Sequence, residues 1–250
     1  MSAEVPPEGG PRPAPGARGS YGVDAPRLLA IPGALVVLGL VQGTLARSAW
    51  PFLGAALVVV FSGFGFYASR RGKFVVWAGL LDDLGLEGDE QVLDIGCGRG
   101  AVLVLAAHRL QSGRAIGVDL WRRRDQSGNG AAATLRNAAV EGVAGQVEVR
   151  TADMAALPFS DGTFDVVVSN AALHNAKAGT ALDRAINEAV RVLRPGGRLL
   201  IADLRATKRY YLRLRSLGML DVTRRNLGWK MWWSGPWLPT MLVTATKPSV

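Results

Sequence analysis

An apolar run that ends in an acid and enters a glycine-rich turn constrains this chain more than any other feature. Residues 92–100 read Val-Leu-Asp-Ile-Gly-Cys-Gly-Arg-Gly, and a helical pattern follows. Glycine lets the backbone turn sharply and approach a ligand closely, because it carries no Cβ. A strand, such a turn and a helix in this order are typical of a nucleotide site at the carboxyl end of a parallel sheet. The stretch therefore predicts a sheet domain with a ligand at that edge.

Short apolar runs alternate with helical stretches over the second half of the chain. The expected strands are residues 91–95, 114–119, 146–151, 164–169 and 198–202, and the expected helices are 74–84, 100–110, 131–141, 179–192 and 205–220. Such alternation predicts an α/β fold, a parallel sheet with helices on both faces. Residues 219–233 and 240–246 are candidates for two closing antiparallel strands.

Acidic side chains follow the next two strands. Asp119 ends the second strand, where a carboxylate can accept both ribose hydroxyls. Asp153 follows the third strand, where it can accept a hydrogen bond from an adenine amino group. A dinucleotide site usually shows G-x-G-x-x-G, but position 101 is Ala. The turn is too short for that pattern, which disfavours a NAD-binding protein.

With these motifs in order, the chain resembles the class I S-adenosylmethionine-dependent methyltransferases, of the broad type that includes quinone and sterol methyltransferases. The motifs that carry the resemblance are residues 94–100, 157–159 with 164–165, and 191–197. It covers about residues 74–250. It implies a Rossmann-like, seven-stranded sheet, S-adenosylmethionine as the cofactor, and methyl transfer to an acceptor.

The resemblance also implies roles for individual residues. Gly96 and Gly98 would flank the methionine part of the cofactor, and Asp94 would position its amino end. Asp119 would hold the ribose, and Leu120 or Trp121 would pack on the adenine. The remaining members of the expected cofactor site are Cys97 as a small filler of the turn, Gly100, Asp153 and the Met154 backbone at the adenine edge, and Asn170 after the fourth strand.

The sequence is less informative about catalysis. His174 follows the fourth strand, near the expected acceptor entrance, and is a candidate general base. The alternative is that it only lines or caps the pocket. The polar loop 125–129 either shapes the cofactor cover or the acceptor pocket, or is a plain solvated loop. We expect no metal site.

The N-terminal part differs in composition. Residues 1–27 are rich in Pro, Gly and Ala, which predicts a disordered tail. Residues 28–45 and 50–68 contain no charge, and each approaches the ~20 residues that span a bilayer. We therefore expect residues 28–69 to form a transmembrane hairpin and residues 70–250 to form the methyltransferase domain. Buried core helices or a signal peptide are the alternatives.

Basic residues predict how this hairpin is oriented. Arg18 and Arg27 precede it, and Arg70, Arg71 and Lys73 follow it, whereas the link between the two stretches carries only Arg47. The distribution of Lys and Arg places both chain ends in the cytoplasm. Because the domain begins after residue 69, we expect its cofactor affinity to be independent of residues 1–69.

Charge and aromatic residues point to a membrane surface. The net charge is +9, and residues 205–230 hold eight Lys and Arg against Asp221 alone. Four tryptophans follow between residues 229 and 237. Such a face suits anionic headgroups, and RNA is a less attractive partner beside a hairpin. The prediction is a membrane-anchored methyltransferase for a small apolar or lipid-like acceptor, with no nucleic acid. A tethered RNA or protein methyltransferase and a non-catalytic cofactor-binding module are the alternatives.

Overall fold

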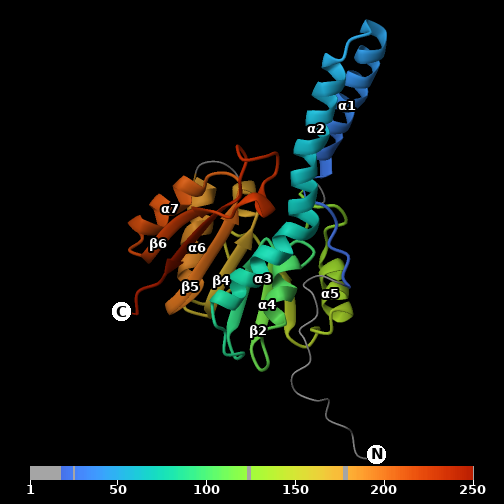
Figure 1. The fold of residues 1–250 in the computed structure, drawn as a ribbon. Coiled ribbons are helices and arrows are strands. Elements are labelled where there is room, and N and C mark those ends of the chain that lie inside the picture. Colours follow the sequence, from blue (N-terminus) through green and yellow to red (C-terminus); the bar gives the residue numbers. More distant parts are fainter. Residues whose placement is uncertain (1–17, 25, 123–124, 177–179, 250) are drawn as a thin grey trace, which may run out of the picture.

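The computed structural model describes residues 18–24, 26–122, 125–176 and 180–249, with residues 26–31 described by their backbone alone. A seven-stranded sheet forms the centre of the molecule, in the order β3-β2-β1-β4-β5-β7-β6 (Figure 1). Its strands are β1 (Gln91–Ile95), β2 (Arg114–Asp119), β3 (Val147–Thr151), β4 (Phe164–Asn170), β5 (Leu193–Asp203), β6 (Leu220–Asn226) and β7 (Met241–Thr246). The first five strands are parallel, and β7 pairs antiparallel with both β5 and β6. The expected sheet and its two closing strands are confirmed.

Helices cover both faces of this sheet. The apolar cluster on one face draws on α3 (Lys73–Asp83), α4 (Ala101–Ala107) and α5 (Ala131–Val140). The cluster on the other face draws on α6 (Thr180–Val192) and α7 (Thr207–Ser216). Strands β1, β2 and β4 are nearly continuous apolar runs because both of their faces are buried. The core therefore fixes the strand ends at which the candidate site lies.

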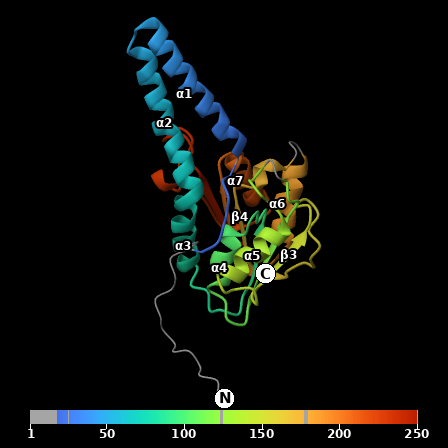
Figure 2. The same cartoon turned by 90° about the vertical axis from the view of Figure 1, so that its right-hand side faces the viewer.

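A helical hairpin projects from this domain (Figures 1 and 2). It consists of α1 (Pro26–Ala46) and α2 (Trp50–Tyr67), joined by a short turn in which Arg47 has a φ of 47°. Helix α2 continues through a π-helical turn, η1 (Ala68–Gly72), into α3. Residues Trp50–Asp83 thus form one helix of 34 residues. The hairpin and the lead-in helix of the domain share one rod, so they are not separate units joined by a linker.

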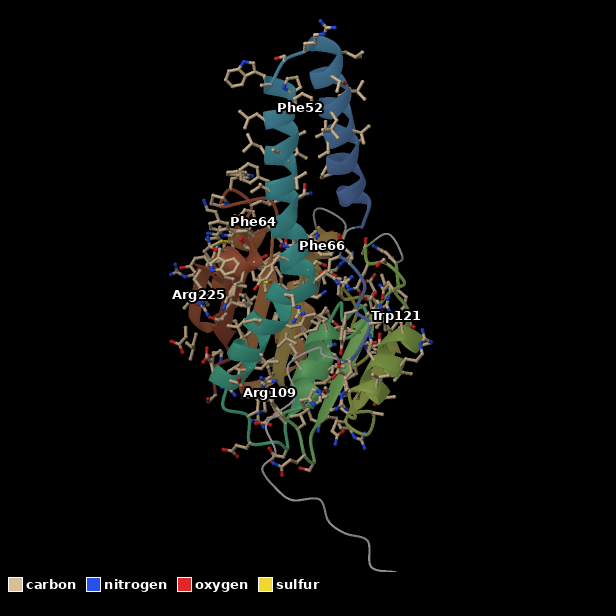
Figure 3. All side chains as sticks on the ribbon, turned by 45° about the vertical axis from the view of Figure 1, so that its right-hand side comes forward. Phe52, Phe64, Phe66, Arg109, Trp121 and Arg225 are labelled. Atoms are coloured by element: carbon tan, nitrogen blue, oxygen red, sulfur yellow. The ribbon has the colours of Figure 1, made fainter. Side chains whose placement is uncertain are left out.

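Two glycines let the hairpin helices approach closely. A Cβ at Gly43 would lie 2.5 Å from the ring of Phe52, which Figure 3 labels on α2. A Cβ at Gly39 would lie 3.0 Å from the Cβ of Ala55, which is itself buried. This G-x-x-x-G spacing places two small residues on one helix face, the arrangement that brings helix backbones together. Most of the other large apolar side chains of α1 and α2 are exposed.

The expected pair of membrane spans is only partly supported. Among the described residues, one helix, Trp50–Asp83, is long and apolar enough to cross a membrane. Its most apolar stretch has a mean hydropathy of 1.8 and is 22% buried. Helix α1 provides a shorter apolar stretch, Pro32–Ala46, which is less than the ~20 residues that span a bilayer. Length and composition alone identify one candidate span, and two transmembrane helices are not confirmed.

Aromatic residues join the base of the hairpin to the C-terminal part of the sheet. The loop between β6 and β7 contains the short helix η3 (Trp229–Met231) and packs along α2. Three aromatic pairs form this contact: Phe61–Trp237, Phe64–Trp232 and Tyr67–Trp229. Phe64 is labelled in Figure 3. Gly72 is required where the chains meet, because a Cβ there would overlap the Lys230 carbonyl. The rings hold the rod against the sheet.

The expected disordered tail is wrong for residues 18–24, which we call the N-terminal strap. The backbone N–H groups of Arg18 and Gly19 donate to Glu141 Oε1 at 3.1 and 2.8 Å. Tyr21 is buried, and its ring packs edge-on against Phe74 with centroids 5.0 Å apart. The strap has few apolar residues, but polar side chains of the domain accept hydrogen bonds from its backbone, and the buried ring of Tyr21 anchors it. Residues 1–17 lie outside the described residues.

Candidate functional site

A pocket opens at the carboxyl ends of β1, β2 and β4. Its floor is the turn between β1 and α4, where Gly96 and Gly98 line the pocket with φ values of 74° and 53°. Gly100, with a φ of 82°, belongs to the same turn but does not line the pocket. A side chain would strain all three positions. At Gly96, a Cβ would also lie only 2.1 Å from the Cβ of Ala172. The turn therefore needs glycine both for its conformation and for its contact with the loop after β4.

Asp119 organises this floor, at the position that the sequence predicted. Its Oδ2 accepts a hydrogen bond from Gly98 N at 2.9 Å, and its Oδ1 accepts one from Trp121 N at 2.6 Å. The side chain thus connects the end of β2 to the glycine turn of β1. A carboxylate held in this way by backbone donors is oriented before any ligand arrives.

Asp94 is a buried carboxyl group at the floor of the pocket. It is 2% exposed, and its Oδ1 has no hydrogen-bond partner among the described residues. Burial, together with the nearby charge of Asp119, raises the pKa of Asp94 to about 8. An unpaired buried carboxyl oxygen is costly unless a donor or a cation reaches it. The pocket therefore offers this atom to a ligand.

Cys97 lies in the same turn and is 7% exposed. Burial, with the charges of Asp94 and Asp119, raises the pKa of this thiol well above its usual range. A thiol in such surroundings stays protonated and is a poor nucleophile. This agrees with its expected role as a small filler of the turn.

The outer wall contains some of the residues expected to contact an adenine, but not all. Leu120 and Met154 line the pocket, as does Ala152. Trp121, labelled in Figure 3, does not line it; its indole N–H donates to Thr151 Oγ1 at 2.7 Å. Asp153 is exposed, and its Oδ1 accepts a hydrogen bond from Ala155 N. Of the alternatives Leu120 and Trp121, the structure places Leu120 at the pocket.

Residues from the N-terminal part of the chain and from the β2–α5 loop form the remaining wall. Asp24 of the strap, Lys73 at the start of α3 and Gln126 of the β2–α5 loop all line the pocket. Gln126 donates through Nε2 to Asp24 Oδ1 at 2.7 Å and accepts through Oε1 from Arg99 N at 2.7 Å. The polar loop 125–129 thus belongs to the site, one of the two alternatives that the sequence left open. Asp24 and Lys73 carry no motif, so the sequence did not identify them.

The loop after β4 holds Asn170 and His174. Asn170 lines the pocket, and its Oδ1 accepts a hydrogen bond from Trp77 Nε1 at 2.8 Å. His174 lies between the pocket-lining residues Ala172 and Asn175, and its Nδ1 is 2.6 Å from Asp203 Oδ1. Asp203, at the end of β5, is fully buried. The sequence did not identify this aspartate, because nothing along the chain relates it to His174.

Asp203 is held in place from a second direction. The hydroxyl of Tyr210, in α7, donates to Asp203 Oδ2 at 3.1 Å. Burial raises the pKa of that phenol, and the Asp203 carboxylate raises it further. The His174 ring is therefore oriented by an aspartate that is itself fixed, which leaves Nε2 as the nitrogen available to a reacting group.

The central region of the chain is similar to known methyltransferases. Residues 93–201 match a family model described as a methyltransferase domain. A ubiquinone/menaquinone biosynthesis C-methyltransferase of Roseobacter denitrificans is 33% identical over 124 residues, which are 50% of this chain and 46% of that protein. The sterol 4-C-methyltransferase of Caenorhabditis elegans is 31% identical over 131 residues, 52% of this chain and 36% of that protein. The chain thus spans less than half the length of these relatives.

Solved structures share the fold at low sequence identity. The geranyl diphosphate C-methyltransferase of Streptomyces coelicolor A3(2), in complex with Mg²⁺, geranyl diphosphate and S-adenosyl-L-homocysteine, has a TM-score of 0.55 at 19% identity, over 70% of this chain and 77% of that one. The [4+2]-cyclase SpnF has a TM-score of 0.56 at 19% identity, over 69% and 81% of the two chains. The expected class I fold is confirmed, and residues 93–201 are the part of this chain that matches the methyltransferase domain model.

Proposed function

We propose that the chain binds S-adenosylmethionine in the pocket described above and transfers its methyl group to a small apolar acceptor at a membrane. The observation that carries the proposal is the polar floor of the pocket. It combines a glycine turn, an oriented Asp119 and the unpartnered Oδ1 of Asp94. When bound, the cofactor supplies a methyl group already activated on a sulfonium centre.

The floor residues fit the parts of this cofactor. Asp119 lies at the end of β2, where its carboxylate can accept the ribose hydroxyls. Asp94 Oδ1 can accept a hydrogen bond from the cationic amino group at the amino-acid end, which supplies the partner this buried atom needs. Leu120 and Met154 provide apolar surface for the adenine ring.

His174 is the candidate general base. Its Nδ1 proton is directed to Asp203, so Nε2 can take a proton from the acceptor as the methyl group arrives. The histidine then becomes a cation, which the buried Asp203 carboxylate stabilises at 2.6 Å. With the cofactor bound, the acceptor would gain the methyl group that the cofactor supplies and would give its proton to His174. This role suits an acceptor whose reacting oxygen or carbon carries a removable proton.

The hairpin supports the membrane part of the proposal. Helix α2, with 18 residues, is about 27 Å long at 1.5 Å per residue, close to the ~30 Å of a bilayer core. Trp50 at the tip is 78% exposed, and Trp229 and Trp237 at the base are 51% and 63% exposed. Tryptophan at two levels along a rod is typical of the two interfaces of a bilayer.

The curated relatives support the acceptor class, since their names specify quinone biosynthesis and a sterol. An enzyme held at the bilayer meets an apolar acceptor at a raised effective concentration. The basic residues of α7 and β6 would face anionic headgroups on the cytoplasmic side. We therefore place the domain in the cytoplasm and the hairpin in the membrane.

A labelling experiment tests this function. Membranes that carry the full-length protein are incubated with S-adenosylmethionine bearing a deuterated methyl group, and lipid, RNA and protein fractions are analysed by mass spectrometry. We expect a lipid-extract component to gain one labelled methyl group. His174→Asn should lower the rate about 10²–10⁴-fold, the usual contribution of a general base, without weakening cofactor binding measured by calorimetry.

The other outcomes are informative. Label confined to RNA or protein would replace the lipid acceptor with a macromolecular one. Cofactor binding without any labelled product would indicate a non-catalytic binding module or a different reaction on the same fold. Full turnover by His174→Asn would exclude His174 as the base and leave it a structural role beside the pocket.

A further inference from the structure

A buried ion pair joins the N-terminal strap to the foot of the hairpin at the pocket wall. Lys73 Nζ lies 2.8 Å from Asp24 Oδ2, and the two side chains are 3% and 16% exposed. Both residues line the pocket. A buried ammonium group needs a charged or polar partner, because leaving it unpaired costs several kcal/mol. Asp24 is the carboxylate that provides this partner in the structure.

The π-helical turn η1 determines where the ammonium group points. Ser69 lies within η1, and Lys73 is the first residue after η1. The two residues are four positions apart, and both contact Asp24. Ser69 Oγ accepts a hydrogen bond from Asp24 N at 2.9 Å and lies 3.1 Å from Asp24 Oδ2. Local π-helical turns are frequent at functional sites. Here the turn brings the lysine of a long rod to the wall of the pocket.

Asp24 has a second partner that does not depend on Lys73. Its Oδ1 accepts a hydrogen bond from Gln126, and its backbone N–H donates to Ser69. The strap can therefore keep two of its contacts if Lys73 turns to another carboxylate. An ammonium group carries three donors on a flexible stem, so it can change partners without movement of the backbone.

The charges of the pocket are arranged for a ligand that has both signs. Asp94 and Asp119 lie on the floor, and Asp94 Oδ1 has no partner in the described part of the chain. Two of the described residues that line the pocket are basic, Lys73 and Arg122. Arg122 follows Asp119 closely in sequence, at the ribose end. Lys73 is the cation that pairs with Asp24, on the strap side of the pocket.

We propose that Lys73 binds the carboxylate at the amino-acid end of the cofactor, and that Asp24 is an internal carboxylate which the ligand carboxylate replaces. This inference rests on the proposed function, because it requires an amino-acid ligand in the pocket. The amino group of that ligand lies toward Asp94 and its carboxylate toward Lys73. The zwitterion thereby pairs with one buried group of each sign.

This exchange links the cofactor to the hairpin. Asp24 lies two residues before α1, and Lys73 directly follows the π turn that ends α2. Binding of the ligand carboxylate alters the contact that closes the base of the hairpin on the strap. If Asp24 is replaced in this way, cofactor affinity depends on residues 1–69, in contrast to the expectation from the sequence. Asp24 and Ser69 both belong to the contact at the pocket wall.

Calorimetry with two ligands tests the inference on the full-length protein in detergent. The ligands are S-adenosylmethionine and its decarboxylated form, which differ in the carboxylate alone. We expect Lys73→Gln to weaken the binding of S-adenosylmethionine about ten-fold or more, as for loss of a charge-assisted hydrogen bond. The affinity for the decarboxylated ligand should stay within about two-fold of the wild-type value. Lys208→Gln, at an exposed position of α7, is the control for loss of one positive charge.

The partner variant tests the exchange itself. Asp24→Asn removes the competing carboxylate, so S-adenosylmethionine should bind as tightly as to the wild type or more tightly. The double variant Asp24→Asn/Lys73→Gln avoids an unpaired buried carboxylate and should bind S-adenosylmethionine as weakly as Lys73→Gln. Binding of neither ligand by the wild-type protein would contradict the proposed function.

Other results would contradict the inference alone. Equal weakening of both ligands by Lys73→Gln and by the double variant would assign Lys73 a structural role. Weaker binding of S-adenosylmethionine by Asp24→Asn would show that Asp24 assists the ligand and is not replaced by it. No effect of Lys73→Gln on either ligand would place the carboxylate elsewhere, with Arg122 the next candidate.

Discussion

The floor of the pocket and its wall on the hairpin side are built in different ways. The floor, residues 94–100 with Asp119, comes from one strand–turn–helix unit and the neighbouring strand, and the buried core holds both. The wall on the hairpin side combines the N-terminal strap, the π turn and the loop 125–129, which hydrogen bonds and an ion pair hold together. The conformation of the floor is therefore fixed mainly by close packing, and that of the wall mainly by polar contacts between segments far apart in the sequence. Substitutions should separate the two.

The largest effect is expected in the floor. Gly96→Ala adds a Cβ 2.1 Å from the Cβ of Ala172, at a φ of 74°. Overpacking and a disfavoured backbone conformation together should lower the free energy of unfolding by about 4 kcal/mol. Chemical denaturation measures this. Gly130→Ala, where a Cβ meets nothing within 4 Å, is the matched control at a less crowded turn. Equal stability of Gly96→Ala and wild type would contradict the crowded floor.

A second effect concerns pH and also belongs to the floor. Because the pKa of Asp94 is raised to about 8 in the folded protein, the folded state keeps a proton that the unfolded state loses near pH 4. The unfolding free energy contributed by Asp94 is complete below pH ~4, falls as the pH rises and levels off above pH ~8. Asp94→Asn cannot titrate at this position, so the wild type should lose stability relative to the variant as the pH rises through that window. A difference independent of pH would contradict the unpaired, buried carboxyl.

The smallest effect should be confined to the wall. Tyr21→Ala removes the one large apolar side chain that anchors the strap, along with its contacts to Phe74 and Glu141. The strap should open locally, at a cost of about 1–2 kcal/mol in its protection against hydrogen exchange, while the β1 and β2 amides remain protected. Leu135→Ala, at a 45% exposed position of α5, is the control. Loss of protection in β1 as well would show that wall and floor unfold together.

Much of the floor could be predicted because its signals are local. The acid, the glycines and the helix after them follow one another in the chain, so Asp94, Gly96, Gly98 and Asp119 lie where the motif indicates. Leu120 and Met154 follow strand ends and also line the pocket, since parallel strands end at one edge of the sheet. Asp153 and Trp121 also follow strand ends, but neither lines the pocket. Their side chains form hydrogen bonds with nearby residues instead.

The sequence by itself determined the strand–helix alternation, the glycine turn and the two apolar stretches, since each depends on residues that are close in the chain. The tertiary structure alone decided that a Pro- and Gly-rich tail ends in an ordered strap, that the second apolar stretch continues into the domain, and that Asp203 orients His174. The physical reason is that these features depend on polar side chains with partners far away in the sequence. The spacing of apolar residues predicts which side chains are buried. Nothing in the sequence around a single carboxylate such as Asp24 predicts which lysine it pairs with.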